Sequence, residues 1–305
     1  ENNLAEIWSL FDFVMPGYLF SYNKFNKEFE VPIVKENNIE VLNKLKKLVT
    51  PFILRRLKKD VLKELPDKIE SIMYVNLEGE QERLYRANLE IIKHEVKSRV
   101  AKGNYKKDKL MILSMLTRLR QLCCDPNLYY DNYCGESAKL EMCLELINTS
   151  IASGHKILLF SQFTSMLSII EKRLNQEQIS SYLLIGNTKK EIRKDLVDKF
   201  NTDNTSVFLI SLRAGGTGLN LTSADVVIHY DPWWNLSVQN QATDRTHRIG
   251  QTKKVQVYQL IAKNTIEEKI MELQLAKRKL AESIIIEDEG IITKMTDEEI
   301  ISLFS

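Results

Sequence analysis

The feature that most constrains the fold is a series of short apolar runs in the second half of the chain. These runs lie at residues 156–160, 181–185, 207–210, 226–230 and 255–261. Most of them are continuously apolar rather than alternating, as in strands that are covered on both faces. Amphipathic segments that fit helices separate several of them, near residues 163–175, 189–200 and 236–247. Alternating strands and helices imply a parallel sheet with right-handed crossovers, so we expect an open α/β domain.

The first half of the chain lacks such runs and is predicted to be helical and irregular. Two stretches have apolar residues at three- and four-residue steps: Tyr85, Leu89, Ile92, Val96 and Val100, then Ile112, Leu116, Leu119 and Cys123. The polar link KGNYKKDK between them predicts a helical hairpin whose tip points into solvent. A last apolar pattern, from Ile266 to Ile284, predicts one closing helix. We therefore expect a helical region at 1–137, a sheet domain at 138–262, and a closing helix with an acidic tail at 263–305.

Composition and length are those of an ordinary globular protein. The chain has 305 residues, of which 44% are hydrophobic and 28% are charged. No apolar run approaches the ~18 residues of a membrane span. The first residues, ENNLAEIWSLF, contain neither a starting methionine nor a signal-peptide pattern, so we expect a fragment of an intracellular protein. The cysteines show no C-x-x-C spacing, which predicts buried, reduced thiols and no metal site.

Charge is unevenly distributed along the chain. The formal net charge of +2 argues neither for nor against nucleic acid. Residues 93–109 carry seven basic and two acidic side chains, whereas the residues after 280 carry seven acids and one lysine. A positive helix tip suits phosphates, and a solvated surface is the alternative interpretation. The charges alone leave both open.

Two candidate ligand-binding segments follow the first and second apolar runs. Open α/β sheets bind ligands at the carboxyl ends of their strands. Ser161 and Gln162 come directly after the first run, where a hydroxyl, an amide and helix-start N–H groups suit a phosphate. Gly186 and Thr188 follow the second run. For both segments the alternative is that the hydroxyl caps the next helix.

A third segment, SLRAGGTGLNLTSAD, follows the third run. Its glycines Gly215, Gly216 and Gly218 let the backbone come close to another backbone or to a phosphate. No Gly-Lys-Ser/Thr follows, so this is not the phosphate loop of P-loop ATPases. Arg213, beside the glycines, would contact an anion if the loop faces nucleic acid.

The fourth segment joins DPWWN to QATDRTHRIGQ. For Trp233 and Trp234 there are two interpretations. One ring packs in the core and the other at its rim, or one of the two rings faces nucleic acid. Gln241, Arg245 and Arg248 have spacings of four and three residues, so we expect them on one face of a helix. That face is expected near the helix end, where a sheet domain binds anions. Guanidinium groups there suit charge neutralisation on a transferring phosphoryl group, whereas a surface helix with scattered charge is the alternative.

Taken in order, these segments resemble the second RecA-like lobe of Swi/Snf-type ATPases, the double-stranded-DNA translocases among superfamily-two helicases. ENNLAEIWSLFDF resembles the tail of the family's third motif, and PFILRRLKKDVLKELPDKIE and LTRLRQLCCDPNL resemble its two helical-region signatures. KILLFSQFTSML, SLRAGGTGLNL, DPWWN and QATDRTHRIGQ resemble the fourth, fifth, linking and sixth motifs. Two departures stand out: the family usually has Asp-Gly-Ser-Thr at residues 185–188, and proline where this chain has Leu236.

The resemblance implies a role for each matching residue. Arg245 and Arg248 would be finger arginines that reach across a cleft to ATP held by a first lobe. The ATP-side residues implied are Gln241, Gly216 and Gly218, and the DNA-binding residues implied are Ser161, Gln162, Thr188, Arg213, Gly215 and Trp234. The hairpin would be the family's second helical insertion, and residues 264–284 its bracing helix.

The resemblance also implies cofactors and partners. ATP and Mg²⁺ would be bound mainly by the first lobe, because this chain has no Gly-Lys-Thr loop and no Asp-Glu-x-His; we therefore expect no ATPase activity from this chain alone. The implied partners of a monomer are double-stranded DNA and that first lobe, without a membrane, in the cytoplasm and nucleoid or in the nucleus. Remodelling, repair and polymerase recycling all use such a motor, so chromatin or RNA polymerase as target stays open. An RNA or single-strand helicase lobe and a stand-alone nucleic-acid-binding scaffold are the alternatives.

Overall fold

The computed structural model describes residues 4–36, 38–54, 65–101, 105–215, 219–234, 236–248 and 250–283. These fall into two compact units, one with residues up to 54 together with 277–283, the other with the remainder. The three-part division expected at residues 137 and 262 stays a prediction. None of the helices in the described ranges is long and apolar enough to cross a membrane.

The first unit consists of short helices around a hydrophobic core of aliphatic and phenylalanine side chains. They are α1 (Leu4–Val14), α2 (Tyr22–Phe25), the π-helical turn η1 (Asn26–Glu30), α3 (Val31–Glu36), α4 (Ile39–Val49) and the 3-10 turn η2 (Thr50–Phe52). Phe25 and Phe29 are buried at its centre. Asn38 begins α4 because its side-chain oxygen accepts hydrogen bonds from the backbone N–H groups of Glu40 and Val41.

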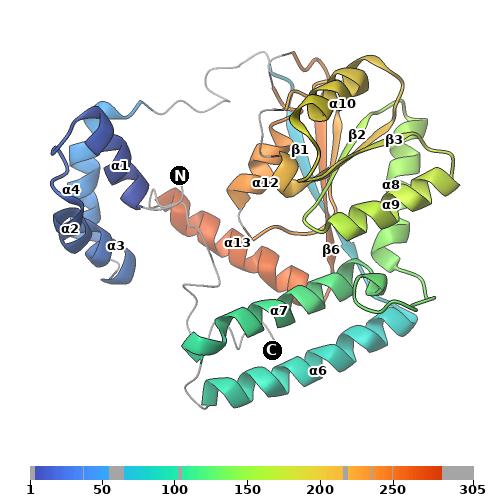
Figure 1. Ribbon diagram of the computed structural model, residues 1–305, viewed down its shortest axis with the longest axis horizontal. Coiled ribbons are helices and arrows are strands. Elements are labelled where there is room, and N and C mark those ends of the chain that lie inside the picture. The colour runs from blue at the N-terminus through green and yellow to red at the C-terminus, as the bar shows by residue number, and fades with distance from the viewer. Residues whose placement is uncertain are drawn as a thin grey trace. The chain divides into compact units, whose positions relative to one another are not determined.

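The second unit is built on a six-stranded parallel sheet (Figure 1). Its strands are β1 (Lys68–Val75), β2 (Ile157–Ser161), β3 (Ser181–Leu184), β4 (Val207–Ser211), β5 (Val226–His229) and β6 (Val255–Ala262), in the order β1-β6-β5-β2-β4-β3. Every pairing between neighbours is parallel. All residues of β2, β4 and β5 are buried, as their continuously apolar runs predict. The expected parallel α/β sheet is therefore confirmed.

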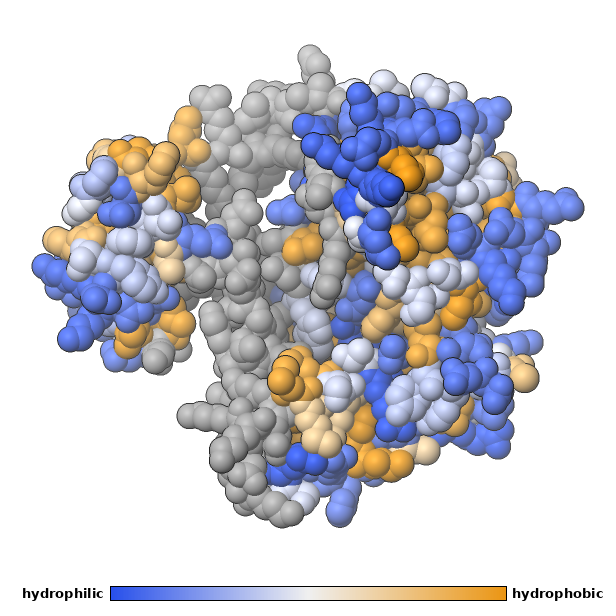
Figure 2. All heavy atoms as spheres, viewed as in Figure 1, coloured by the Kyte–Doolittle hydropathy of each residue, from blue (hydrophilic) through white to orange (hydrophobic). Residues whose placement is uncertain are grey.

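Helices cover both faces of this sheet. On one face α8 (Ala138–Ala152) and α9 (Thr164–Gln176) pack on the odd-numbered apolar residues of β2, and on the other α10 (Lys190–Thr202), α11 (Leu212–Gly215) and α12 (Leu236–Thr243) pack on the even-numbered ones. Figure 2 shows hydrophilic residues over the outer surface of α10. The layered arrangement is the RecA-like fold that the sequence analysis expects, with the helices on both faces.

A helical hairpin and a long closing helix complete the second unit. The hairpin consists of α6 (Gly79–Ala101) and α7 (Tyr105–Cys124), which is followed by the 3-10 turn η3 (Pro126–Leu128). The closing helix α13 (Ile266–Ser283) packs on both through Ile266 and Ile270. The hairpin's buried residues include Tyr85, Ile92 and Leu119, from the predicted apolar faces. Both helical elements are confirmed, whereas the expected solvent-facing tip at 102–104 and the acidic tail after 283 lie outside the described residues.

Strand β1 corrects the expectation that the first half of the chain is only helical and irregular. It pairs with β6 along its whole length, from Lys68 opposite Val255 to Val75 opposite Ala262. As an edge strand it is mostly exposed, and Val75 is its only buried residue. An edge strand needs no continuous apolar run, so the pattern used for the other five strands does not detect it. The cysteine prediction also needs one correction, because Cys134 is exposed while the other three are buried and all four are free.

Candidate functional site

The carboxyl ends of β2 and β5 are joined by a buried carboxylate. Asp231 follows β5 and is 1% exposed. The hydroxyl of Ser161 donates to its Oδ1 at 2.5 Å, and the backbone N–H of Gln162 donates to the same atom at 3.2 Å. Burial raises the pKa of Asp231, although Arg120 and the Ser161 hydroxyl act in the opposite direction.

Ser161 itself is fully buried, and this limits what its side chain does. Its oxygen accepts from the backbone N–H of Phe163, which precedes α9, but it is not the helix-capping residue that one interpretation expects. With its hydroxyl engaged by Asp231, the side chain is not exposed for a DNA contact. The side-chain oxygen of Gln162 accepts from Arg120 and its side-chain nitrogen is buried, so the DNA role of this segment stays a prediction that rests on the backbone at the start of α9.

Arg120, on α7, connects this carboxylate to the loops around it. It is 2% exposed, and its Nη2 lies 3.6 Å from Asp231 Oδ2. Nη1 donates to the side-chain oxygen of Gln162 at 2.9 Å, and Nη2 donates to the carbonyl of Pro232. One guanidinium group therefore contacts the segments that follow two different strands.

The adjacent tryptophans point into different environments. Trp233 packs against the cluster beneath α10 and α12, whereas Trp234 packs against the cluster formed by the hairpin and α13. The ring of Trp234 lies 5.4 Å from the Arg120 guanidinium carbon. Both rings are half-buried, so each contributes to packing while part of it faces outward. The DNA contact expected of Trp234 stays a prediction.

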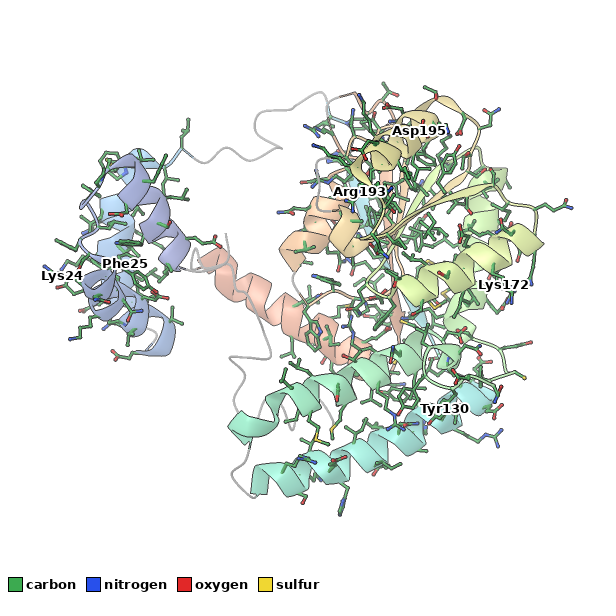
Figure 3. All side chains as sticks on the ribbon, in the orientation of Figure 1. Lys24, Phe25, Tyr130, Lys172, Arg193 and Asp195 are labelled. Carbon is green, nitrogen blue, oxygen red and sulfur yellow. The ribbon has the colours of Figure 1, made fainter. Side chains whose placement is uncertain are left out.

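The loop after β3 is fixed by its own side chains and by an arginine. The hydroxyl of Thr188 accepts a hydrogen bond from the backbone N–H of Ile185 at 3.2 Å. It does not cap α10, because the N-cap residue of that helix is Lys189. Arg193 donates to the carbonyls of Thr188 and Gly186, both at 2.8 Å. Figure 3 labels Arg193 on the first turns of α10. The loop is preformed, and the DNA contact of Thr188 stays a prediction.

The glycine segment after β4 lies partly outside the described residues. The backbone of Arg213 and Gly215 belongs to the short helix α11. Gly216 and Gly218, expected near ATP, fall among the residues that the structure does not describe. Beyond these residues, the backbone N–H of Leu221 donates to the carbonyl of Arg245. The loop and the arginine segment are therefore neighbours.

The arginine segment corrects the expectation of three residues on one helix face. Helix α12 ends at Thr243, so Gln241 lies on the helix but Arg245 and Arg248 follow it in a turn. Ser, Thr and Asp residues favour turns over helix interiors, and the run Thr243-Asp244 ends this helix early. Gln241 and Arg248 are exposed, and Arg245 is half-buried.

The arginine loop, residues 244–251, is fastened next to the start of β5. The side-chain amide of Gln251 donates to the carbonyls of Thr222 and Ala224, at 3.1 and 2.8 Å. A ring nitrogen of His247 lies 2.8 Å from the carbonyl of Pro66, just ahead of β1. Since residues 222 and 224 precede β5, the loop reaches the amino ends of the strands. The expected position at their carboxyl ends is wrong.

Five of the predicted site residues therefore lie in two separate groups. Ser161, Gln162 and Trp234 come together around Arg120 at the carboxyl edge of the sheet, whereas Arg245 and Arg248 lie on the arginine loop. Within the described ranges, no group of three His, Cys, Asp or Glu side chains is placed to hold a metal ion.

Two organising residues escape the sequence analysis. Arg120 stands four residues after Leu116, so it lies on the apolar face of α7. A single arginine on an otherwise apolar helix face is the sequence pattern that would have indicated its role. Gln251 is buried and is the last residue of the motif QATDRTHRIGQ, but the motif alone gives it no role.

Two models of protein families match this chain and give the class of protein to which it belongs. Residues 1–128 match the model of the SNF2-related domain, and residues 138–250 match the helicase conserved C-terminal domain, which ends within the arginine loop. The chain is thus of the SNF2-related helicase class, and its second part is a helicase C-terminal domain.

Individual relatives narrow this to a family. The SWI2/SNF2 ATPase C-terminal domain of Sulfolobus solfataricus is 34% identical with a TM-score of 0.64, and the match covers 78% of this chain and 98% of that one. The SWI2/SNF2 ATPase core of the same organism in complex with double-stranded DNA is 36% identical with a TM-score of 0.66, covering 99% of this chain and 64% of that one. The chain belongs to the SWI2/SNF2 family.

Curated relatives are much longer than the chain. An ATP-dependent helicase of Mycoplasma pneumoniae is 40% identical over all of this chain, which spans 29% of that relative's length. The family of this chain therefore does not by itself establish the activity of the whole protein.

Proposed function

We propose that the chain is the C-terminal lobe of an ATP-dependent double-stranded-DNA translocase. Arg245 and Arg248 act as arginine fingers, and the loops at the carboxyl ends of β2, β3 and β5 contact the DNA backbone. Membership of the SWI2/SNF2 family supports the motor, and the relative in complex with double-stranded DNA supports the ligand. Closure of the lobes completes the site, and opening moves the DNA-facing loops along the duplex.

The observation that carries this proposal is a pair of arginines held close together on a fastened loop. Burial lowers the pKa of Arg245, and the charge of Arg248 lowers it further, against the opposing effect of Asp244. Two like charges held together raise each other's energy, and an anion between them removes this cost. The spread negative charge of a transferring phosphoryl group fits such a pair.

The chain's residues fit part of an ATP site but not all of it. The arginines suit the anionic oxygens of a triphosphate, and Gln241 on the preceding helix is exposed on the same segment. The described residues include no acidic cluster of the kind that holds Mg²⁺. ATP and Mg²⁺ supply the phosphoryl group and its charge neutralisation when bound to a first lobe. This chain contributes the arginines that orient and neutralise that group.

The test is Arg248→Ala in the complete protein. Because finger arginines contribute about 10³-fold or more to turnover, we expect DNA-stimulated ATPase activity to fall by at least that order. Duplex affinity stays largely unchanged, since the arginine loop is separate from the DNA-facing loops. The matched control is Arg86→Ala on α6, where the arginine side chain is 74% exposed. Turnover that survives Arg248→Ala contradicts the finger role.

Two further assays separate the alternatives. The purified 305-residue chain is expected to hydrolyse no ATP with duplex DNA, and measurable DNA-stimulated turnover contradicts this. Stimulation of the complete protein by duplex DNA without strand separation supports a translocase. Stimulation by RNA or single strands alone points to the helicase alternative, and no stimulation by any nucleic acid points to a scaffold.

A further inference from the structure

We propose that Arg120 is a positioning residue that fixes the loops after β2 and β5 to the helical hairpin, so that these DNA-facing loops and the hairpin move as one body. The inference rests on the proposed function for the ligand of the loops, but its contacts are independent of that ligand. Arg120 touches no nucleic acid in this scheme, because it is 2% exposed.

One rigid group, the guanidinium of Arg120 on α7, connects three elements. The planar guanidinium of Arg120 donates through Nη1 to Gln162, after β2, and through Nη2 to the carbonyl of Pro232, after β5. A lysine has one charged nitrogen on a flexible stem and cannot hold both acceptors in this fixed geometry. The two loops are therefore aligned with α7 by the shape of the group as well as by its charge.

Two aromatic rings lie against the same guanidinium group. The guanidinium carbon lies 5.7 Å from the ring centroid of Phe163 and 5.4 Å from that of Trp234. These rings come from the same two loops, and each contact adds a cation–π attraction. Phe163 directly precedes α9, so the start of that helix is held as well.

The hairpin end of the connection is firmly packed. On α7, Leu116 and Leu119 lie four residues and one residue before Arg120 and are buried in the cluster that α6, α7 and α13 share. Trp234 packs against that same cluster. A displacement of the hairpin therefore moves Arg120 and the rings on it together.

The buried pair of Arg120 and Asp231 is energetically costly. A buried arginine and a buried carboxylate are costly to remove from water, and an apolar pair of the same volume often gives equal or greater stability. Within the described residues, Arg120 Nε is buried without a hydrogen-bond partner, which adds to this cost. Alignment of the loops is a function that an apolar pair would not provide.

The test compares Arg120→Lys and Arg120→Met with wild type in two measurements on the 305-residue chain. The first is amide hydrogen exchange in peptides over residues 161–164 and 231–234. We expect exchange in both loops to rise roughly tenfold, while the interiors of β2 and β5 keep their protection. Arg120→Lys retains the charge, so it decides the outcome even if Arg120→Met fails to fold.

The second measurement is duplex DNA affinity as a function of salt. Misaligned loops should weaken binding roughly tenfold for Arg120→Lys, with an unchanged salt dependence, because no phosphate contact is lost. If the salt slope instead falls by about one, Arg120 contacts a phosphate directly and the positioning role is wrong.

The matched control is Arg173→Met. Arg173 also joins two elements through a carboxylate, with Nη1 donating to Glu141 at 2.9 Å, but on the surface between α9 and α8. It should change neither measurement. Exchange that rises throughout the sheet in Arg120→Lys, or does not rise in the two loops, overturns the inference. If wild type binds no duplex, the proposed function fails, and the exchange measurement still decides the role of Arg120.

Discussion

The two edges of the sheet hold their functional segments by different kinds of interaction. At the carboxyl edge, the buried charges of Asp231 and Arg120 lock the loops after β2 and β5. At the amino edge, the side chains of Gln251 and His247 contact backbone carbonyls and so hold the arginine loop. A buried charge that loses its partner is destabilised by several kcal/mol, whereas a neutral hydrogen bond contributes about 1 kcal/mol.

This difference fits two different tasks. Loops that track a regular duplex need one fixed arrangement, and a buried charge pair strongly disfavours any other. Arginines that meet a nucleotide only in one stage of a cycle need a loop that adjusts at low cost. We therefore expect the loops after β2 and β5 to be rigid and the arginine loop to adjust.

The largest effect is expected at Asp231, the buried carboxylate of the carboxyl edge. In Asp231→Ala, Arg120 is left buried without its counter-charge, so we expect the free energy of unfolding to fall by about 3–5 kcal/mol. Urea denaturation of the 305-residue chain measures this free energy, provided that the spectroscopic signal comes from the sheet unit.

The control for Asp231 is the double variant Asp231→Ala with Arg120→Met. It removes both charges, so it should be destabilised by less than the sum of the two single variants. Additive losses, or a loss of under about 1 kcal/mol in Asp231→Ala, would show that the pair does not lock this edge.

A weaker effect is expected at the amino edge, in Gln251→Ala. Loss of this amide leaves the carbonyls of Thr222 and Ala224 without their side-chain donor, and we expect a cost of about 1–3 kcal/mol. Amide exchange should rise at Lys253, whose N–H donates to Gln251, and at Leu221, whose N–H donates to Arg245. Gln176→Ala, at the exposed end of α9, is the control. A loss at Gln251 as large as that at Asp231 would erase the distinction between the edges.

The sequence predicts the carboxyl edge better than the amino edge, for a physical reason. The runs that form β2, β4 and β5 are continuously apolar because both faces are covered, so the polar residues directly after them are placed with confidence at the strand ends. Their contact with one another depends on Arg120, which is far away in sequence and comes near only through tertiary packing.

The amino edge depends on where a helix stops, and this is a weakly encoded property. Spacing alone continues the helix past Thr243, whereas the turn from Asp244 onward moves the two arginines off its face. Strand β1 is missed because it is exposed and lies at the sheet's edge. At the end of α12 and in β1, the local sequence pattern does not determine the structure, which depends on contacts made only in the folded chain.

His229 tests whether the two edges are connected. It is the last residue of β5, and its Nε2 lies 2.9 Å from the hydroxyl of Thr243, the last residue of α12 before the arginine loop. Its ring stacks on Phe160 with centroids 5.6 Å apart. Burial lowers the pKa of His229 to about 3, with a smaller contribution from Lys68. The neutral ring is therefore a packed link between the sheet and the end of α12.

The sign of the resulting pH dependence follows from proton binding. Between pH 6.5 and about 3 the unfolded chain binds a proton at His229 and the folded chain does not. Its contribution to stability is complete above pH 6.5 and is lost on acidification, by at most about 1.4 kcal/mol per pH unit. His229→Gln keeps a hydrogen-bonding side chain without this titration, so its free energy of unfolding should fall less steeply between pH 6 and 4, by up to that slope. His94→Gln, exposed on α6, is the matched control. Equal slopes for wild type and His229→Gln would mean that His229 is not held neutral, and that this link between the edges is absent.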